Sequence, residues 1–148
     1  MGRECNARRA RAAPLSARLQ RVEGRKLVVY IEDNPSNFAL ARKILELSGE
    51  YEVIGAKDGV SGLALVRDRR PDVVLLDLDL PGISGIEVVQ RIRATPDIAA
   101  TPVLAVTASV MKRERRQAMD AGCDRFIEKP FDIHELRSQV DEVAAIQR

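Results

Sequence analysis

Short apolar runs alternate with longer amphipathic stretches along most of the chain. The runs are rich in valine, leucine and isoleucine and are bounded by polar residues or glycine. This pattern is typical of strands that are buried in a parallel sheet. We therefore predict strands over residues 27–31, 51–56, 72–76, 101–108 and 124–129.

The stretches between these runs place apolar residues at helical spacing. In the first of them, Phe38, Ala41 and Leu45 fall on one helical face. Asp58 and Asp132 stand where two of the helices would begin, and aspartate is a favourable N-cap residue. The pattern predicts helices over residues 35–49, 58–70, 84–95, 110–122 and 132–146.

Strands and helices thus alternate from residue 27 to the last predicted helix. Such alternation predicts an α/β fold with a parallel sheet. Because crossovers between parallel strands are right-handed, the helices should cover both faces of the sheet. No internal repeat or low-complexity segment interrupts the pattern.

Composition is that of a single globular domain. The chain has 148 residues, of which 45% are hydrophobic, which is enough for one sizeable core. No apolar run approaches the roughly 18 residues of a membrane span, and no apolar signal-peptide core is found near the start. The two cysteines, Cys5 and Cys123, form no disulfide framework. We therefore expect a cytoplasmic protein with no membrane partner.

Charge is unevenly distributed along the chain. Residues 1–26 carry a net charge of +6, whereas residues 27–148 carry −4. We expect residues 1–26 to form a basic, flexible arm, residues 27–146 to form the domain, and residues 147–148 to form a short tail. Binding of an anionic surface or nucleic acid by the arm is the alternative, but a nucleic-acid partner is not expected.

Polar residues follow four of the predicted strands at the point where each strand ends. They are Glu32, Asp33, Asp77, Thr107 and Lys129. The carboxyl ends of parallel strands share one edge of a sheet, and ligands bind there. The fold can therefore bring these five side chains into one pocket, although they lie far apart in the sequence.

The chemistry of these residues suits a phosphoryl group. Three carboxylates in one pocket repel one another, and Mg²⁺, which prefers oxygen ligands, would relieve that repulsion. Lys129 adds a fixed positive charge and Thr107 adds a hydroxyl donor, both of which suit the oxygens of a transferred phosphoryl group. Asp77, on the middle strand of the pattern, is the natural nucleophile for an aspartyl phosphate.

Four motifs, VVYIEDN, PDVVLLDLDLPGISG, VLAVTAS and FIEKPF, occur in this order along the chain. Together they resemble the response-regulator receiver domain, and the resemblance covers residues 27–146. It implies a flavodoxin-like, doubly wound sheet of five parallel strands in the order 2-1-3-4-5, with five helices. The segments IEDNPSN and VTASVMK look most like receivers that stand alone in cell-cycle signalling or belong to hybrid kinases of two-component phosphorelays.

The resemblance implies a regulatory phosphoacceptor that catalyses at most its own phosphorylation and dephosphorylation. It implies that Asp77 accepts a phosphoryl group from a histidine kinase or a histidine phosphotransfer protein. It also implies a Mg²⁺ site made by the carboxylates of Glu32, Asp33 and Asp77, completed by the main-chain carbonyl of Asp79. No organic cofactor is expected.

The same resemblance implies a switch. Thr107 would move to the phosphoryl oxygen, Lys129 would pair with the phosphoryl group, and Phe126 takes the place of the family's switch aromatic. The Lys129–Pro130 bond resembles the family's cis peptide. The response would change the face formed by residues 110–146, where a downstream protein would bind.

Two other functions stay open. LLDLDLPG also resembles the first motif of haloacid-dehalogenase-type phosphatases, in which the first aspartate of D-x-D is the nucleophile. That motif lies on the first strand of those enzymes, whereas two predicted strands precede Asp77, and Glu32 and Asp33 would have no role. A receiver-like scaffold that is never phosphorylated is the other alternative, against which the intact set of site residues argues.

Phe38 has two interpretations. Its spacing with Ala41 and Leu45 fits a core position. Its place just after the acidic pair equally fits the rim of the pocket, where a histidine donor would dock and an aromatic side chain could carry much of the binding energy.

Overall fold

The computed structural model describes residues 24–108, 112–130 and 132–146. Nearly all of the predicted basic arm therefore lies outside the described residues, as do Phe131 and the tail formed by residues 147–148. Residues 109–111, which join the fourth predicted strand to the helix after it, lie outside them as well.

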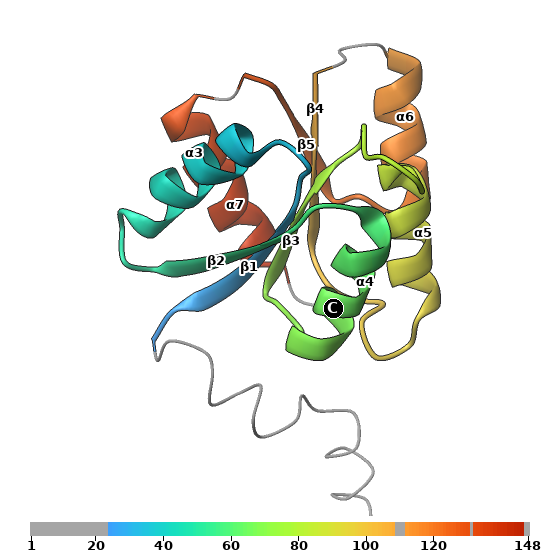
Figure 1. Ribbon diagram of the computed structural model, residues 1–148, viewed down its shortest axis with the longest axis horizontal. Helices are drawn as coiled ribbons and strands as arrows, with labels where there is room; N and C mark the ends of the chain where they lie inside the picture. The colour runs from blue at the N-terminus through green and yellow to red at the C-terminus, as the bar shows by residue number, and fades with distance from the viewer. Residues whose placement is uncertain (1–23, 109–111, 131, 147–148) are drawn as a thin grey trace, which may run out of the picture.

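A parallel sheet forms the centre of the described part of the chain (Figure 1). Its strands run in the order β2-β1-β3-β4-β5, and every neighbouring pair is parallel. This is the predicted order, and the sheet confirms the flavodoxin-like fold. The strands are β1 (Lys26–Ile31), β2 (Tyr51–Ala56), β3 (Val73–Asp77), β4 (Val103–Thr107) and β5 (Arg125–Glu128).

Helices cover both faces of the sheet. Figure 1 shows α3 and α7 on one face and α4, α5 and α6 on the other. Among the described residues, every helix is too short and too polar to cross a bilayer. The helices are α3 (Pro35–Glu46), α4 (Gly59–Arg69), α5 (Gly85–Ala94), α6 (Lys112–Ala121) and α7 (Ile133–Ala144).

Side-chain caps set the starts of α3, α4, α5 and α7, as predicted at two positions. The Asp58 carboxylate accepts a hydrogen bond from the Ser61 backbone N–H, and Asp132 accepts one from His134. The end of α3 comes earlier than predicted, because the chain leaves the helix after Glu46 and turns through Gly49 at a φ of 76°.

Alternation along each strand divides the core into two halves. Val28 and Tyr30 of β1 pack toward α3 and α7, whereas Val29 and Ile31 pack toward α4 and α5. The core is almost entirely aliphatic, as the low aromatic content predicts. This period of two also decides on which face each side chain at the carboxyl edge lies.

Candidate functional site

Three of the predicted site residues continue strand positions that face α3 and α7. Glu32 follows Tyr30 by two residues, Asp77 follows Leu75, and Lys129 follows Ile127. Because side chains two apart on a strand point to the same face, the alternation directs these three toward the same side of the sheet. Thr107 follows Ala105 by two residues, so it lies on the opposite face.

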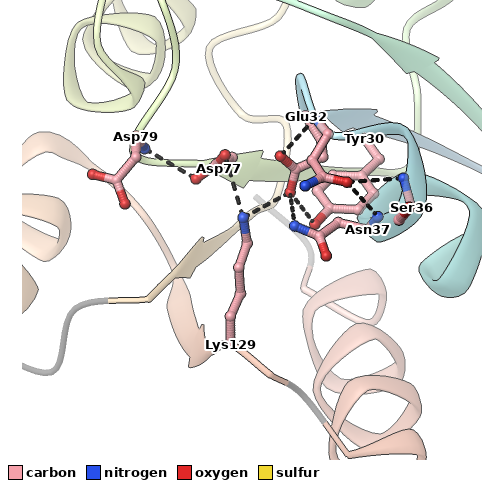
Figure 2. A network of polar contacts seen from close by, with 8 residues as sticks. Tyr30, Glu32, Ser36, Asn37, Asp77, Asp79 and Lys129 are labelled. Carbon is pink, nitrogen blue, oxygen red and sulfur yellow. Dashed lines mark hydrogen bonds and ion pairs between the residues drawn. The ribbon is translucent and has the colours of Figure 1, made fainter.

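Lys129 joins the two buried carboxylates (Figure 2). Its Nζ lies 2.8 Å from Glu32 Oε1 and 3.3 Å from Asp77 Oδ2. The two acids come from β1 and β3, which are paired neighbours, and the lysine reaches them from the end of β5. The predicted convergence of Glu32, Asp77 and Lys129 is therefore present in the folded chain.

Glu32 accepts further hydrogen bonds besides the ion pair. The Tyr30 hydroxyl donates to Oε1 at 2.9 Å, and the backbone N–H of Asn34 donates to Oε2 at 3.2 Å. The Asn37 side-chain amide makes a longer contact with Oε1, at 3.5 Å. Asn34 is also the N-cap of α3, so the start of that helix holds Glu32 in place.

The acidic cluster fits a divalent cation. One carboxylate oxygen from each of Glu32, Asp33 and Asp77 lies within 4.8 Å of the others. Glu32 and Asp77 are buried, whereas Asp33 is exposed, so the cluster is open to solvent on one side. An all-oxygen donor set with room for water is what Mg²⁺ prefers, and these residues therefore fit the predicted metal.

Asp77 is oriented from the loop that follows β3. The backbone N–H of Asp79 donates to Asp77 Oδ1 at 3.0 Å, while Oδ2 faces Lys129. Figure 2 shows the carboxylate of Asp79 directed away from Asp77. The side chain of Asp79 is thus not part of the cluster, and a metal contact by its main-chain carbonyl stays a prediction.

Burial and charge shift the ionisation of the cluster in opposite directions. Burial, together with the neighbouring Glu32, raises the pKa of Asp77 to about 6. Burial also acts to raise the pKa of Glu32, but hydrogen bonds from Lys129 and other donors outweigh it and lower that pKa. Burial acts to lower the pKa of Lys129, but its carboxylate partners raise it overall. A proton taken up by the pair would therefore reside on Asp77.

Tyr30 stays neutral beside this charge. Burial, followed by the negative charge of Glu32, raises the pKa of Tyr30 far above its ordinary value. Its hydroxyl is therefore a hydrogen-bond donor across the whole range in which the protein would work.

Strand alternation places Thr107 and Phe126 on the other face of the sheet. Thr107 is 2% exposed, and its carbonyl accepts a hydrogen bond from the Lys129 backbone N–H at 2.8 Å. Phe126 is half-buried, and the guanidinium of Arg115 stacks over its ring at 4.1 Å. The Lys129–Pro130 peptide bond is cis, as predicted.

A groove of about 450 Å³ begins beside Glu32 and Asp33 and continues between α3 and β2. Phe38 lines it and is half-buried, with its ring against Tyr30 and against Gly55. A β-carbon on Gly55 would lie 2.4 Å from the Phe38 ring, so glycine is required for this contact. Phe38 therefore packs on the core and also lines the groove beside the acidic pair, and its contact with a histidine donor stays a prediction.

The sequence pattern does not predict that Tyr30 and Asn37 contact Glu32. Tyr30 lies within an apolar run, and the pattern predicts only that it is a strand residue. The spacing of Tyr30 and Glu32 could have predicted their contact. Residues two apart on a strand lie on the same face, and a buried tyrosine hydroxyl needs a hydrogen-bond partner.

Comparison with known proteins identifies the family. Residues 28–141 match the family model described as "Response regulator receiver domain". The chain is 39% identical to the polar-differentiation response regulator DivK of Brucella anthropi over 108 residues, which are 73% of this chain and 87% of that protein.

Solved structures agree with this match. A response regulator from Chloroflexus aurantiacus superposes with a TM-score of 0.79 at 27% identity, covering 82% of this chain and 99% of that one. The receiver domain of the sensor histidine kinase PA1611 from Pseudomonas aeruginosa, solved with a magnesium ion coordinated in its active-site cleft, gives a TM-score of 0.76 at 27% identity and the same coverage. The chain belongs to the response regulator receiver domain family.

Proposed function

We propose that this receiver domain accepts a phosphoryl group on Asp77 from a histidine kinase or a histidine phosphotransfer protein. The observation that carries the proposal is the bridge that Lys129 makes between Asp77 and Glu32, with Asp33 within reach of both carboxylates. A purely structural ion pair would match one cation with one acid, whereas here a single lysine contacts two carboxylates of a cluster of three. Membership in a regulatory family supports the same function.

In the proposed step, a carboxylate oxygen of Asp77 attacks the phosphorus of the donor. The new O–P bond forms as the P–N bond to the donor histidine breaks, and the bonding electrons leave with the imidazole nitrogen. Lys129 stays beside the oxygen that becomes part of the acyl phosphate and offsets the added negative charge. The Asp79 N–H fixes the other oxygen of the carboxylate, so the nucleophile is held in one orientation.

Glu32, Asp33 and Asp77 would hold Mg²⁺, together with the main-chain carbonyl of Asp79. When bound, the ion supplies positive charge that neutralises the carboxylates and the transferred phosphoryl oxygens. The similarity to the magnesium-containing receiver of PA1611 supports this choice of metal.

The response to phosphorylation would pass to the face formed by residues 110–146. Thr107 would approach the phosphoryl group and Phe126 would follow it inward, shifting the protein between two states. Arg113, Arg115 and Arg116 are exposed on this face, so an acidic partner surface would be complementary to it. We infer residues 27–146 as the domain that carries this switch, and residues 1–26 as a basic arm outside it.

Incubation with acetyl phosphate and Mg²⁺, followed by intact-mass spectrometry, tests the proposal. We expect one added phosphoryl group on the wild-type chain, and none on Asp77→Asn or when EDTA replaces Mg²⁺. Asp79→Asn, which removes an exposed carboxylate two residues away, is the matched control and should still be labelled. Full labelling of Asp77→Asn would contradict the assignment of the acceptor.

The same samples separate the alternatives. A phosphatase would turn over a small phosphate ester many times, whereas a phosphoacceptor takes one equivalent. A scaffold would take none. If a donor labels Asp77 but amide chemical shifts then move only beside it, the proposed change of the 110–146 face is wrong.

A further inference from the structure

Tyr30 is a polar residue in the middle of an aliphatic strand. It is 0% exposed, and the core residues on the α3 and α7 face of the sheet surround its ring. The ring of Phe38 lies against it at a centroid distance of 6.1 Å. The tyrosine is therefore held on all sides, and its hydroxyl donates to Glu32 Oε1 from a fixed position.

The two oxygens of Glu32 have different surroundings. Oε1 accepts from the Tyr30 hydroxyl and from Lys129 Nζ, with the Asn37 amide farther away. Oε2 accepts a hydrogen bond from the backbone N–H of Asn34, and the carboxyl group of Asp77 also lies within hydrogen-bonding reach of Glu32. A carboxylate has about four lone-pair sites in total, two on each oxygen. The contacts described here occupy those of Oε1, whereas Oε2 keeps capacity for a further positive partner.

We propose that Tyr30 is a positioning residue of the cation site: its hydroxyl fixes the Glu32 carboxylate so that Oε1 holds Lys129 and Oε2 is presented to the metal. This inference rests on the proposed Mg²⁺-dependent function and assigns a role to a residue that does not itself touch the ion. Outer-shell partners of this kind typically change metal affinity by about 10–100-fold when they are removed. Glu32 would keep its other donors, so we expect the low end of that range.

Tyr51 provides a matched control. It is the other tyrosine of the chain, it is buried, and its hydroxyl also donates to a carboxylate, that of Asp141. Tyr51 lies at the start of β2, beside Lys26, at the opposite edge of the sheet from the acidic cluster. Tyr30→Phe and Tyr51→Phe therefore each remove one hydroxyl from one buried tyrosine–carboxylate pair, and only the first lies at the proposed site.

The experiment is a calorimetric Mg²⁺ titration of the full chain without any phosphoryl donor. Tyr30→Phe should weaken Mg²⁺ binding roughly tenfold, whereas Tyr51→Phe should bind Mg²⁺ as the wild type does. Labelling of Tyr30→Phe by acetyl phosphate should fall at low Mg²⁺ and recover at saturating Mg²⁺. Unchanged or tighter Mg²⁺ binding in Tyr30→Phe would overturn the proposal, as would an equal loss in both variants.

A second variant keeps the test independent of how well Tyr30→Phe folds. Glu32→Asp keeps the charge but shortens the side chain by one methylene, which withdraws the carboxylate from the Tyr30 hydroxyl. It should lose Mg²⁺ affinity to a similar extent, and adding Tyr30→Phe to it should cause no further loss; additive losses would overturn the proposal. If the wild type binds Mg²⁺ but no donor labels it, the proposed function fails while the titration still decides the role of Tyr30.

Discussion

Two largely buried basic side chains, Lys129 and Arg93, hold opposite edges of the sheet in different ways. Lys129 lies at the carboxyl edge between two carboxylates, with a third nearby. Arg93 lies at the amino edge, where the chain enters β4 and β5. Its guanidinium donates to the carboxylate of Asp124. It also donates to three main-chain carbonyls, those of Ala99, Thr101 and Gly122.

The difference lies in the balance of charge. At the Arg93 edge, one cation meets one acid, and Asp124 Oδ2 also accepts the Val103 N–H at 2.8 Å. The remaining donors meet neutral carbonyls, so the cluster is satisfied within the protein. At the Lys129 edge, one cation contacts two carboxylates and a third, that of Asp33, lies nearby. Burial and the neighbouring Glu32 raise the pKa of Asp77. A cluster with more acids than cations lowers the stability of the fold and can bind a positively charged ligand. A cluster with equal numbers of acids and cations connects the loops that carry it.

The largest effect should come from breaking the balanced edge. Arg93→Ala leaves the Asp124 carboxylate without its buried cation, together with several carbonyls, and removal of one partner from a buried pair costs about 3–5 kcal/mol. Urea unfolding followed by circular dichroism would measure the loss. The affinity of the folded fraction for Mg²⁺ should not change, because the acidic cluster lies at the other edge.

Arg91→Ala is the control for this variant. Arg91 lies on the same helix and pairs with Glu87, but both side chains are about half exposed, and such surface pairs contribute about 1 kcal/mol or less. If Arg93→Ala lowers the free energy of unfolding by no more than Arg91→Ala does, the Arg93 cluster does not hold the amino edge as described.

The two edges also differ in how far sequence could predict them. Glu32, Asp77 and Lys129 were predictable because each follows an apolar run, and the carboxyl ends of parallel strands meet. The role of Arg93 was not predicted, since an arginine in the last turn of a helix usually points to solvent. Its partners are mostly backbone carbonyls, one of them 29 residues away at Gly122. Because every residue has a backbone carbonyl, the sequence does not show which of them accept from Arg93.

The ends of elements were less predictable than their existence. The fourth strand was expected over residues 101–108, but β4 spans Val103–Thr107. Pro102 has no N–H to donate to the sheet, although its carbonyl accepts from Val74 at 2.9 Å. Tyr30 was missed for a different reason: its aromatic ring belongs in the core, and only the geometry of the folded strand shows which polar group its hydroxyl meets.

Removing the negative charge of Asp77 from the acidic cluster should raise the free energy of unfolding. Without Mg²⁺, the folded-state pKa of Asp77 is about 6, above its ordinary value of 3.8. Stability is therefore lost as the pH rises from about 4 to about 6, and the loss persists above that range. One pKa unit corresponds to about 1.4 kcal/mol; allowing for solvent beside the exposed Asp33, Asp77→Asn should gain about 1–2 kcal/mol at pH 7.5 in EDTA.

The measurement compares urea midpoints of the wild type and Asp77→Asn at pH 7.5 and pH 4. The gain should be present at pH 7.5 and largely absent at pH 4, where the wild-type Asp77 is protonated. Saturating Mg²⁺ should reduce the difference in urea midpoint between the two proteins at pH 7.5, because the ion stabilises only the wild-type cluster. Asp79→Asn should show no such gain. A variant less stable than the wild type at pH 7.5 would mean that Lys129 already balances the cluster.

The smallest effect concerns how the carboxyl edge connects to α6. Arg115 stacks on Phe126 at 4.1 Å, and an exposed cation–π contact is worth about 0.5–1 kcal/mol. In a double-mutant cycle, Arg115→Ala and Phe126→Leu should therefore show a coupling energy of that size in urea unfolding. Arg116→Ala removes the same charge from the next residue of α6 and should show no coupling to Phe126→Leu.

Phosphorylation sharpens this last test. If Phe126 moves inward when Asp77 is phosphorylated, its ring leaves the guanidinium of Arg115, and the stacking contact favours the unphosphorylated state. Arg115→Ala should then shift the equilibrium toward the switched state by the lost coupling, a change of about two- to fivefold. Amide chemical shifts of α6 and β5, recorded with acetyl phosphate and Mg²⁺, would report the populations. A coupling energy that is the same with and without the phosphoryl group would show that Phe126 does not move, and that any signal leaves the acidic cluster by another route.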